Sequence, residues 1–272
     1  MRSIFFLSFL GFFCSSYGPP NCFLYEENPD CYQACKEAEI AITFPQGSKA
    51  SQEHFIKSIT LCNSFDYSHY EKSVPFAKRG LMNEWLPMLN VALELNPEEY
   101  LAIRGWYHFF FMKNYSLAIE DIQKFDSLVE YDIGFTGDGT YHLNIMLGLC
   151  YKGLGNKEKA IEVIEGQLND ENYEPSIYDF LHLGVLYLET ENYPKATESL
   201  KRQVEINPIS EVYYYMALVK KAEQKLHSAK GNLEMALKLY DTDITMENGY
   251  IELADEIYRA DILNAMKSIN KK

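Results

Sequence analysis

Apolar residues recur every three or four positions along most of the chain, in segments of about a dozen residues, and this spacing places them on one face of an α-helix. Short stretches without this pattern separate the segments, for example Gly153–Asn156 and Glu191–Tyr193. Connections of this length join neighbouring antiparallel helices. The pattern therefore predicts an all-α chain built from pairs of helices.

The helix pairs follow a repeating order of small and large residues. Counting from Gly184, a large residue follows at position 3, a small residue at 12, an aliphatic residue at 16 and a helix-ending residue at 24. The same order begins at Gly148, one window earlier, and at Ala217, one window later. A period of roughly 35 residues predicts stacked helical hairpins. In the window from Gly184 the residues in question are Tyr187, Ala196, Leu200 and Pro208.

The small residues explain why a helix accepts Gly184. Glycine within a helix costs about 1 kcal/mol relative to alanine. Gly184 on the first helix and Ala196 on the second allow the two backbones to approach closely, and Leu200 fills the space beside them. This close packing, which a larger residue would prevent, therefore offsets the helix-propensity cost of glycine.

Weaker copies of the repeat begin at Glu39, Ser73 and Trp106, so we expect about six hairpins over residues 32–243. Residues 19–31 are then an N-terminal extension. Trp85 departs from the pattern because it stands where the other copies have a small residue. The step from Trp106 to Gly148 is longer than the other steps, which predicts an insertion in the glycine-containing stretch EYDIGFTGDGTYH.

These windows resemble the tetratricopeptide repeat family, most clearly over residues 141–241. There the sequence reads YHLNIMLGLCYKGLGNKEKAIEVIEGQL and YDFLHLGVLYLETENYPKATESLKRQVEINP. The resemblance is weaker over residues 66–130 and weakest over 32–65. It implies an α-solenoid of stacked antiparallel helix pairs. Trp85 and Trp106 are departures, because the family prefers small residues at their positions.

The last segment, residues 244–272, is predicted to cap the solenoid. Apolar residues occur at helical spacing over 247–269, with charged residues on the opposite face. A solenoid exposes its last hydrophobic face unless another element covers it. The apolar residues of this predicted helix are Ile251, Ala254, Ile257, Tyr258, Ile262 and Met266.

The N-terminal segment, residues 1–18, has the layout of a secretory signal peptide. Arg2 precedes the apolar run from Ile4 to Phe13, and small and polar residues follow it. The run is too short for a membrane-spanning helix. We expect cleavage near Ser16 and a secreted, periplasmic or cell-envelope protein. A retained anchor or a lipid on Cys14 is the alternative.

Five cysteines remain after this cleavage, and four of them lie close to the new N-terminus. An oxidising compartment favours disulfides among Cys22, Cys31, Cys35 and Cys62. Cys31 and Cys35 begin the first helix of the N-terminal hairpin, and Cys62 ends the second. Antiparallel packing therefore pairs Cys62 with Cys31 or Cys35 and leaves the other for Cys22. A zinc site is the weaker alternative, because the sequence contains no C-x2-C pair.

The remaining cysteine, Cys150, lies in the apolar stretch LGLCY, so we expect a buried, unpaired thiol. The chain has 25 Lys and Arg against 39 Asp and Glu, a net charge of −14, which disfavours nucleic acids as partners. No nucleotide-binding, metalloprotease or hydrolase motif occurs. The loop from Asp132 to Asp138 is a weak calcium alternative that lacks the regular series of oxygen ligands. We therefore expect no enzymatic activity, no cofactor and no metal.

Binding to another protein is the function that this sequence favours. In stacked hairpins the first helix of each pair faces the concave groove, and here that face is apolar and rich in tyrosine. Rigid aromatic side chains suit recognition of a peptide or a helix. Some of them could instead pack on neighbouring hairpins or on a terminal helix that lies in the groove. The predicted groove residues are Tyr67, Tyr70, Tyr107, His142, Ile145, Tyr178, Leu181 and Tyr214.

We therefore expect a non-catalytic scaffold that binds a peptide or helix of a protein partner in the groove. The alternative is a lipid- or membrane-tethered structural subunit of a cell-envelope assembly. Some tetratricopeptide-repeat proteins hold a C-terminal carboxylate with a ring of basic residues on this face. The corresponding wall here carries Ile145, Leu149, Leu181 and Val185. Recognition of an acidic chaperone tail is therefore not expected.

Overall fold

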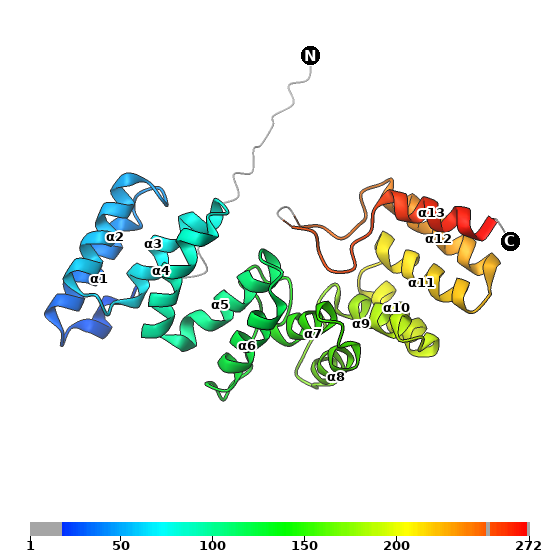
Figure 1. The fold of residues 1–272 in the computed structure, drawn as a ribbon, viewed down its shortest axis with the longest axis horizontal. Helices are drawn as coiled ribbons and strands as arrows, with labels where there is room; N and C mark the ends of the chain where they lie inside the picture. The colour runs from blue at the N-terminus through cyan, green and yellow to red at the C-terminus, as the bar shows by residue number, and fades with distance from the viewer. Residues whose placement is uncertain (1–17, 249–250, 271–272) are drawn as a thin grey trace, which may run out of the picture. The chain divides into compact units, whose positions relative to one another are not determined.

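A computed structural model describes residues 18–248 and 251–270 of the chain. Over these residues it contains thirteen α-helices and one 3-10 helix, and no β-strand (Figure 1). An isolated β-bridge joins Phe135 and His142. The predicted all-α solenoid is thus confirmed. None of the described helices is both long and apolar enough to span a bilayer. The predicted signal peptide lies almost entirely outside the described residues.

The chain divides into two compact units, and the division falls between Tyr100 and Leu101, inside one helix. Unit 1 contains two helical hairpins, in which α1 packs on α2 and α3 packs on α4. Its elements are η1 (Cys22–Tyr25), α1 (Pro29–Ala41), α2 (Lys49–Leu61), α3 (Asp66–Lys78) and α4 (Met82–Leu95). Helix α5 (Pro97–Phe110) contains the division.

Unit 2 continues the hairpin series from α5 to α12, and α13 packs on α12. Each hairpin pairs an odd-numbered helix with the even-numbered helix that follows it, as the repeat predicted. The helices are α6 (Tyr115–Asp126), α7 (Leu143–Gly153), α8 (Lys157–Leu168), α9 (Asp179–Glu189), α10 (Tyr193–Ile206), α11 (Ser210–Ala222), α12 (Leu226–Tyr240) and α13 (Arg259–Asn270).

Close helix contacts occur at the glycines of the repeat. A Cβ atom added to Gly184 would lie 2.7 Å from Cγ of Leu200, and one added to Gly148 would collide with Ile164. Ala196 and Leu200 are themselves fully buried. A side chain at Gly184 would therefore force Leu200 or its helix to shift.

The third hairpin uses Gly105, and not the predicted Trp106, as its small residue. A Cβ atom at Gly105 would lie 3.0 Å from Ile122 and 3.2 Å from Asp121. The shift has a simple cause in the length of the turn. Four residues, 111–114, join α5 to α6, whereas three residues, 154–156, join α7 to α8. The extra residue moves the contact back by one position.

The turns within the hairpins of unit 2 share one backbone feature. The residue before the start of each second helix is its N-cap, and the residue before that cap has a positive φ. Only one of these four turns places glycine at the positive-φ position. The positive-φ residues are Lys113, Gly155, Glu191 and Gln224. The N-cap asparagines, whose side chains accept from a backbone N–H of the helix, are Asn114, Asn156 and Asn192.

The predicted insertion before the fourth hairpin is a non-helical loop that its own hydrogen bonds organise. The Asp138 carboxylate accepts from the hydroxyls of Thr136 and Thr140, at 2.8 and 2.7 Å. The Thr136 N–H donates to the carbonyl of Tyr141 at 2.8 Å. These contacts place His142 at the start of α7.

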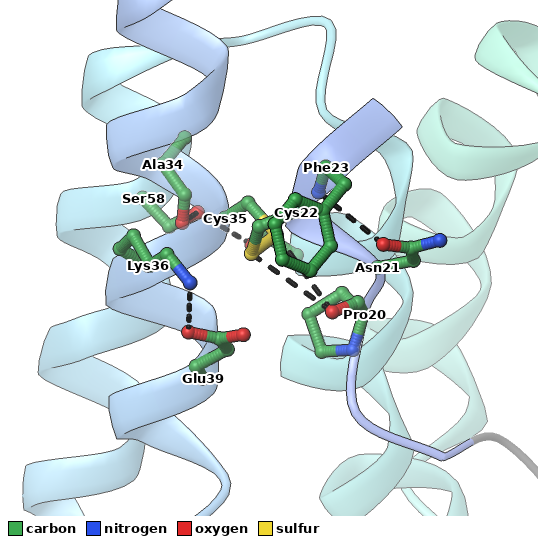
Figure 2. Close-up of a disulfide and its surroundings, with 10 residues drawn as sticks. Pro20, Asn21, Cys22, Phe23, Ala34, Cys35, Lys36, Glu39 and Ser58 are labelled. Carbon is green, nitrogen blue, oxygen red and sulfur yellow. Dashed lines mark hydrogen bonds and ion pairs between the residues drawn. A yellow bond between two sulfur atoms is a disulfide. The ribbon is translucent and has the colours of Figure 1, made fainter. Parts of the chain in front are cut away.

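Two disulfides fix the N-terminal end of unit 1. Cys22 of η1 bonds to Cys35 in α1 (Figure 2), and Cys31 in α1 bonds to Cys62, which caps α2. The sequence left open whether Cys62 pairs with Cys31 or Cys35, and the structure selects Cys31. Cys150 is buried with a free thiol, and burial raises the pKa of that thiol.

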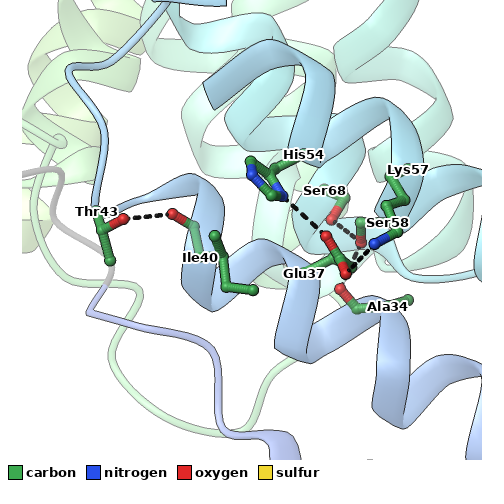
Figure 3. A network of polar contacts seen from close by, with 8 residues as sticks. All are labelled: Ala34, Glu37, Ile40, Thr43, His54, Lys57, Ser58 and Ser68. Atoms are coloured by element: carbon green, nitrogen blue, oxygen red, sulfur yellow. Dashed lines mark hydrogen bonds and ion pairs between the residues drawn. The ribbon is translucent and has the colours of Figure 1, made fainter. Parts of the chain in front are cut away.

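Polar contacts join the first three helices of unit 1 (Figure 3). Glu37 on α1 accepts from Lys57 at 2.5 Å and lies 2.8 Å from His54, both on α2. Ser58 donates to the carbonyl of Ala34 at 2.7 Å and lies 2.6 Å from the hydroxyl of Ser68 on α3. Buried hydroxyls thus satisfy one another where the helices meet.

The C-terminal capping helix is shorter than predicted. The sequence predicted a helix over 247–269, but α13 begins only at Arg259, and residues 251–258 are not helical. We call residues 246–258, which the structure describes except at 249 and 250, the strap. It belongs to the orange-to-red connection that extends beyond α12 and returns to α13 (Figure 1). Asp255 in the strap has a positive φ of 63°, which no α-helix contains.

Candidate functional site

The first helices of the last three hairpins form one continuous wall in unit 2. Helix α7 contacts α9, and α9 contacts α11, in addition to the contacts of each with its own hairpin partner. We call the face of α7, α9 and α11 the inner wall. Side chains from all three helices bond to the strap, so the strap lies along this wall.

Glu211, at the start of α11, binds the N-terminal end of the strap. Its Oε2 accepts from the N–H of Met246 at 3.1 Å. Burial raises the pKa of Glu211 to about 7 and outweighs the lowering effect of hydrogen bonds from the backbone. Among the described residues, Oε1 has no hydrogen-bond partner. This environment favours the neutral carboxylic acid.

Tyr178, just before α9, recognises the strap through a backbone amide. Its hydroxyl accepts from the N–H of Glu247 at 3.3 Å. At the far end, Nζ of Lys113 donates to the carbonyl of Glu252 at 3.4 Å. With Glu211, three side chains of unit 2 therefore contact main-chain atoms of the strap. Such contacts do not depend on which side chains the bound segment carries.

Asp255 makes the charged contact between the strap and the inner wall. Its Oδ2 lies 2.7 Å from Nδ1 of His182 on α9, and its Oδ1 pairs with Nζ of Lys152 on α7. His182 is fully buried, and its Nε2 lies 3.2 Å from the hydroxyl of Tyr141. Although burial raises the pKa of the Asp255 carboxyl, Lys152 and His182 outweigh this effect and hold it below its usual value.

Apolar side chains of the strap are buried as well. Met246, Leu253 and Ile257 each expose less than 5% of their surface. Leu253 precedes Asp255 by two residues, and its N–H is bonded within the strap to the carboxylate of Glu256 at 2.9 Å. The strap is thus held by both apolar burial and charge.

A pocket of about 410 Å³ lies beside the strap, at the α5–α6 end of the wall. Aromatic and aliphatic side chains line it on the wall side, and Lys113 and Lys152 add positive charge. Pockets with this mixture of apolar surface and a few polar groups bind side chains or small ligands. Its apolar wall residues include Phe109, Phe110, Tyr115, Tyr141 and Leu149.

The predicted groove residues are distributed over both units. In unit 1, Tyr67 is half-buried beside Phe65, and Tyr70 is buried with its ring 5.0 Å from that of Tyr100. In unit 2, Tyr107 is half-buried against Trp106 and Phe111.

The other predicted residues all lie in the last three hairpins of unit 2. His142 is fully buried at the N-cap of α7, where its Nδ1 accepts from the N–H of Asn144. Ile145 and Leu181 are also fully buried. Tyr214 packs into the cluster that α11, α12 and α13 share. Among the predicted groove residues, Tyr178 is the one that we find hydrogen-bonded to the described part of the strap.

Sequence reasoning missed Lys152, His182 and Asp255. The partners of Asp255 lie 103 and 73 residues away, so no local spacing connects them. Glu211 stands six residues before Ala217, as the predicted groove residue Tyr178 stands six residues before Gly184, so the two occupy equivalent positions of the repeat. That offset is the one sequence signal that marks strap-binding residues.

No metal centre is evident in this region. Over residues 18–248 and 251–270, no three His, Cys, Asp or Glu side chains are grouped so that they could hold a metal ion. His182 and Asp255 are instead engaged with Tyr141 and Lys152. The arrangement can hold a polypeptide segment, through amide, carboxylate and apolar contacts.

Comparisons with known proteins agree with this architecture. The family model of the tetratricopeptide repeat matches residues 141–168, which span α7 and α8. No curated protein matches the sequence. Many solved structures do match the fold, at low sequence identity.

Three of these structures illustrate the likeness. PilW, a widely conserved type IV pilus biogenesis factor, is 12% identical with a TM-score of 0.57, over 77% of this chain and 94% of PilW. YrrB, a TPR protein with an unusual peptide-binding site, is 16% identical with a TM-score of 0.54, over 71% of this chain and 96% of YrrB. A chain of the APC/C hetero-tetramer Cut9–Hcn1 is 18% identical with a TM-score of 0.56, over 91% of this chain. This chain spans only 44% of the length of that matched chain. At these identities the likeness shows the fold.

Proposed function

We propose that this chain, which has a tetratricopeptide-repeat fold and matches the repeat's family model over residues 141–168, is a non-catalytic scaffold that holds a segment of a protein partner on the inner wall of unit 2. One observation carries the proposal: the wall already holds a non-helical segment of this same chain. It does so through Glu211 and Tyr178, which bond to backbone amides. A surface that binds main-chain atoms in this way suits a peptide.

The aromatic pocket supports the proposal. Phe109, Phe110 and Tyr141 provide a rigid apolar surface, and Lys113 lies at its side. Aromatic residues such as Tyr and Trp are enriched among the few residues that carry most of the affinity at protein interfaces. An apolar side chain of the partner would fill the pocket while its backbone follows the wall.

Site-specific photocrosslinking tests this proposal. A photoreactive phenylalanine replaces Lys113, which lines the pocket and is exposed, in cells that naturally make the protein. The matched control replaces Lys124, an exposed lysine on α6 that does not line the pocket. We expect a discrete protein adduct from position 113 and none from position 124. Equal adducts from both positions, or an adduct from 124 alone, would contradict binding at the inner wall.

We also propose that the protein works in an oxidising compartment outside the cytoplasm. The two disulfides of unit 1 support this location, because such bonds persist in secreted and envelope proteins. The signal peptide itself remains a prediction. The mass of the mature N-terminus decides between a start near Tyr17 and an acylated Cys14, and the latter would favour a tethered subunit.

A further inference from the structure

We infer that the strap is a built-in occupant of the partner site, which a partner displaces by placing its own carboxylate between Lys152 and His182. This inference rests on the proposed function and specifies the partner's chemistry: an acidic polypeptide segment. Three features of the strap support it: the strap is separable from the core, it is longer than the connection requires, and its departure would leave charged groups without a partner.

The strap can leave without undoing the C-terminal cap. Helices α11, α12 and α13 share a hydrophobic cluster in which most of the buried residues lie outside the strap. Among the described residues of the strap, Ile257 alone belongs to this cluster. The strap is therefore a loop whose two ends stay anchored by independent packing. The buried members that belong to the helices are Ala217, Ala229, Leu233, Ala236, Ile262, Ala265 and Ile269.

The connection is longer than the turn from one helix to the next requires. Residues 223–225 suffice to join α11 to α12, whereas residues 241–258 lie between α12 and α13. Closing a longer loop costs more conformational entropy. Here the additional length carries Asp255 to α7 and α9, two helices that α13 itself does not need to reach.

Lys152 and His182 favour a carboxylate in any segment that occupies the inner wall. His182 is fully buried while the strap is in place, and without Asp255 its Nδ1 would lose the carboxylate that accepts from it. Lys152 would keep Glu189, at 3.3 Å, but Lys157 already shares that carboxylate at 3.1 Å. Leaving one member of a buried charged network without its partner is strongly unfavourable. A neutral segment would therefore compete poorly with the strap.

The remaining contacts specify a polypeptide. Glu211 and Tyr178 accept from amide N–H groups, and Lys113 donates to a carbonyl. The strap turns at Ala254 and Asp255, where the positive φ directs the carboxylate into the wall. The matching partner is thus a turn-forming peptide with an aspartate, preceded at two residues by an apolar side chain such as Leu253.

A peptide added in trans tests the inference directly. The probe is a labelled synthetic peptide of residues 246–258, MENGYIELADEIY, and fluorescence anisotropy measures its binding. The receptor is the full chain, either unchanged or with residues 248–256 replaced by glycine and serine in equal number. Circular dichroism and thermal unfolding confirm that the replaced chain is folded.

We expect the peptide to bind the replaced chain at least about tenfold more tightly than the unchanged chain, because the tethered strap competes at high effective concentration. Lys152→Met in the replaced chain, or Asn in place of Asp255 in the peptide, should weaken binding about tenfold or more. Lys157→Met is the matched control, since Lys157 pairs with Glu189 and makes no ion pair with the described residues of the strap.

A folded replaced chain that does not bind the peptide would overturn the inference, as would equal binding to the unchanged chain. The same holds if the peptide with Asn in place of Asp255 binds as well as the original. These outcomes are distinct from failure of the proposed function. A partner crosslinked at position 113 without peptide binding removes only this inference. If the peptide binds but no partner is crosslinked, the strap is still an occupant of the wall, and the proposal of an external partner is wrong.

Discussion

Asp255 lies 2.7 Å from Nδ1 of His182, a residue 73 positions earlier in the chain. The contact joins the non-helical strap to the middle of the repeat array, and Lys152 completes it from the preceding hairpin. A repeat protein normally makes contacts between neighbouring units only. Here one aspartate connects the C-terminal segment to two earlier hairpins, so the strap occupies the same wall that we propose for partner binding.

The glycine contacts predict a stability difference between two alanine substitutions. Gly184→Ala should lower the free energy of unfolding by about 1–3 kcal/mol, because the new Cβ would lie 2.7 Å from Leu200. Gly166→Ala is the matched control, since no atom lies within 4 Å of a Cβ there. It should raise stability by up to about 1 kcal/mol through helix propensity. Urea unfolding measures both, and equal effects would refute close packing at Gly184.

The turns predict a second pair of opposite effects. Gln224 has a φ of 59° at the position where another hairpin has Gly155, with a φ of 80°. Gln224→Gly should raise the free energy of unfolding by up to about 1 kcal/mol, because it relieves left-handed strain. Gly155→Ala should lower it by about 1 kcal/mol. Thermal unfolding provides the comparison, and a loss of stability in Gln224→Gly would count against a strained turn.

The disulfide between Cys31 and Cys62 should contribute to the stability of unit 1 in particular. Its cysteines are 31 residues apart, and a closed loop of that length stabilises by about 3–4 kcal/mol in the chain-entropy treatment. Serine at both positions should accelerate amide exchange in α1 and α2 and leave α9 and α10 unchanged. Hydrogen–deuterium exchange resolves the two units. Uniform acceleration in both would contradict a local role.

The raised pKa of Glu211 predicts that the free energy of unfolding falls as the pH rises. Its pKa is about 7 in the fold, above the ordinary value of 4.5, so the folded protein holds a proton that the unfolded chain releases between these values. Stability from this group is full below about pH 4.5 and declines toward pH 7, by at most about 1.4 kcal/mol per pH unit. Glu211→Gln should flatten this slope in urea unfolding between pH 5 and 7. An unchanged slope would show that Glu211 does not titrate there.

Asp255 acts in the opposite direction and in a lower pH window. Lys152 and His182 hold its pKa below the ordinary value of 3.8 against the effect of burial. Its contribution is therefore present at neutral pH and is lost as the pH falls through that lowered pKa. At neutral pH the free energy of unfolding of Asp255→Asn should be lower than that of the unchanged chain. The two values should converge in strong acid, and urea unfolding over this pH range measures both.

The sequence could predict the hairpins because their determinants are local. The spacing from Gly184 to Ala196 and Leu200 follows from two helices and a short turn, and the structure reproduces it. The register at Gly105 was missed because one additional residue in a turn shifts the contact without changing helical periodicity. Turn length must be known before small residues can be aligned.

The strap could not be predicted for a different reason. Ile251, Ala254 and Ile257 have helical spacing, yet their segment is bound in a non-helical form by residues far away in sequence. Tertiary contacts to Lys152 and His182 override a weak local preference. The predicted tyrosine-lined groove likewise rested on helix faces alone, and an occupant supplied by the same chain leaves no periodic signal on those faces.

We infer above that Asp255 fastens a separable strap to the inner wall. Hydrogen–deuterium exchange on the unchanged chain and on Asp255→Asn tests it most directly, because asparagine also tolerates the positive φ at this position. We expect the amides of residues 246–258 to exchange about tenfold faster or more in the variant, while α7, α9 and α12 keep their protection. Unchanged exchange in the strap, or equal loss across those helices, would contradict it.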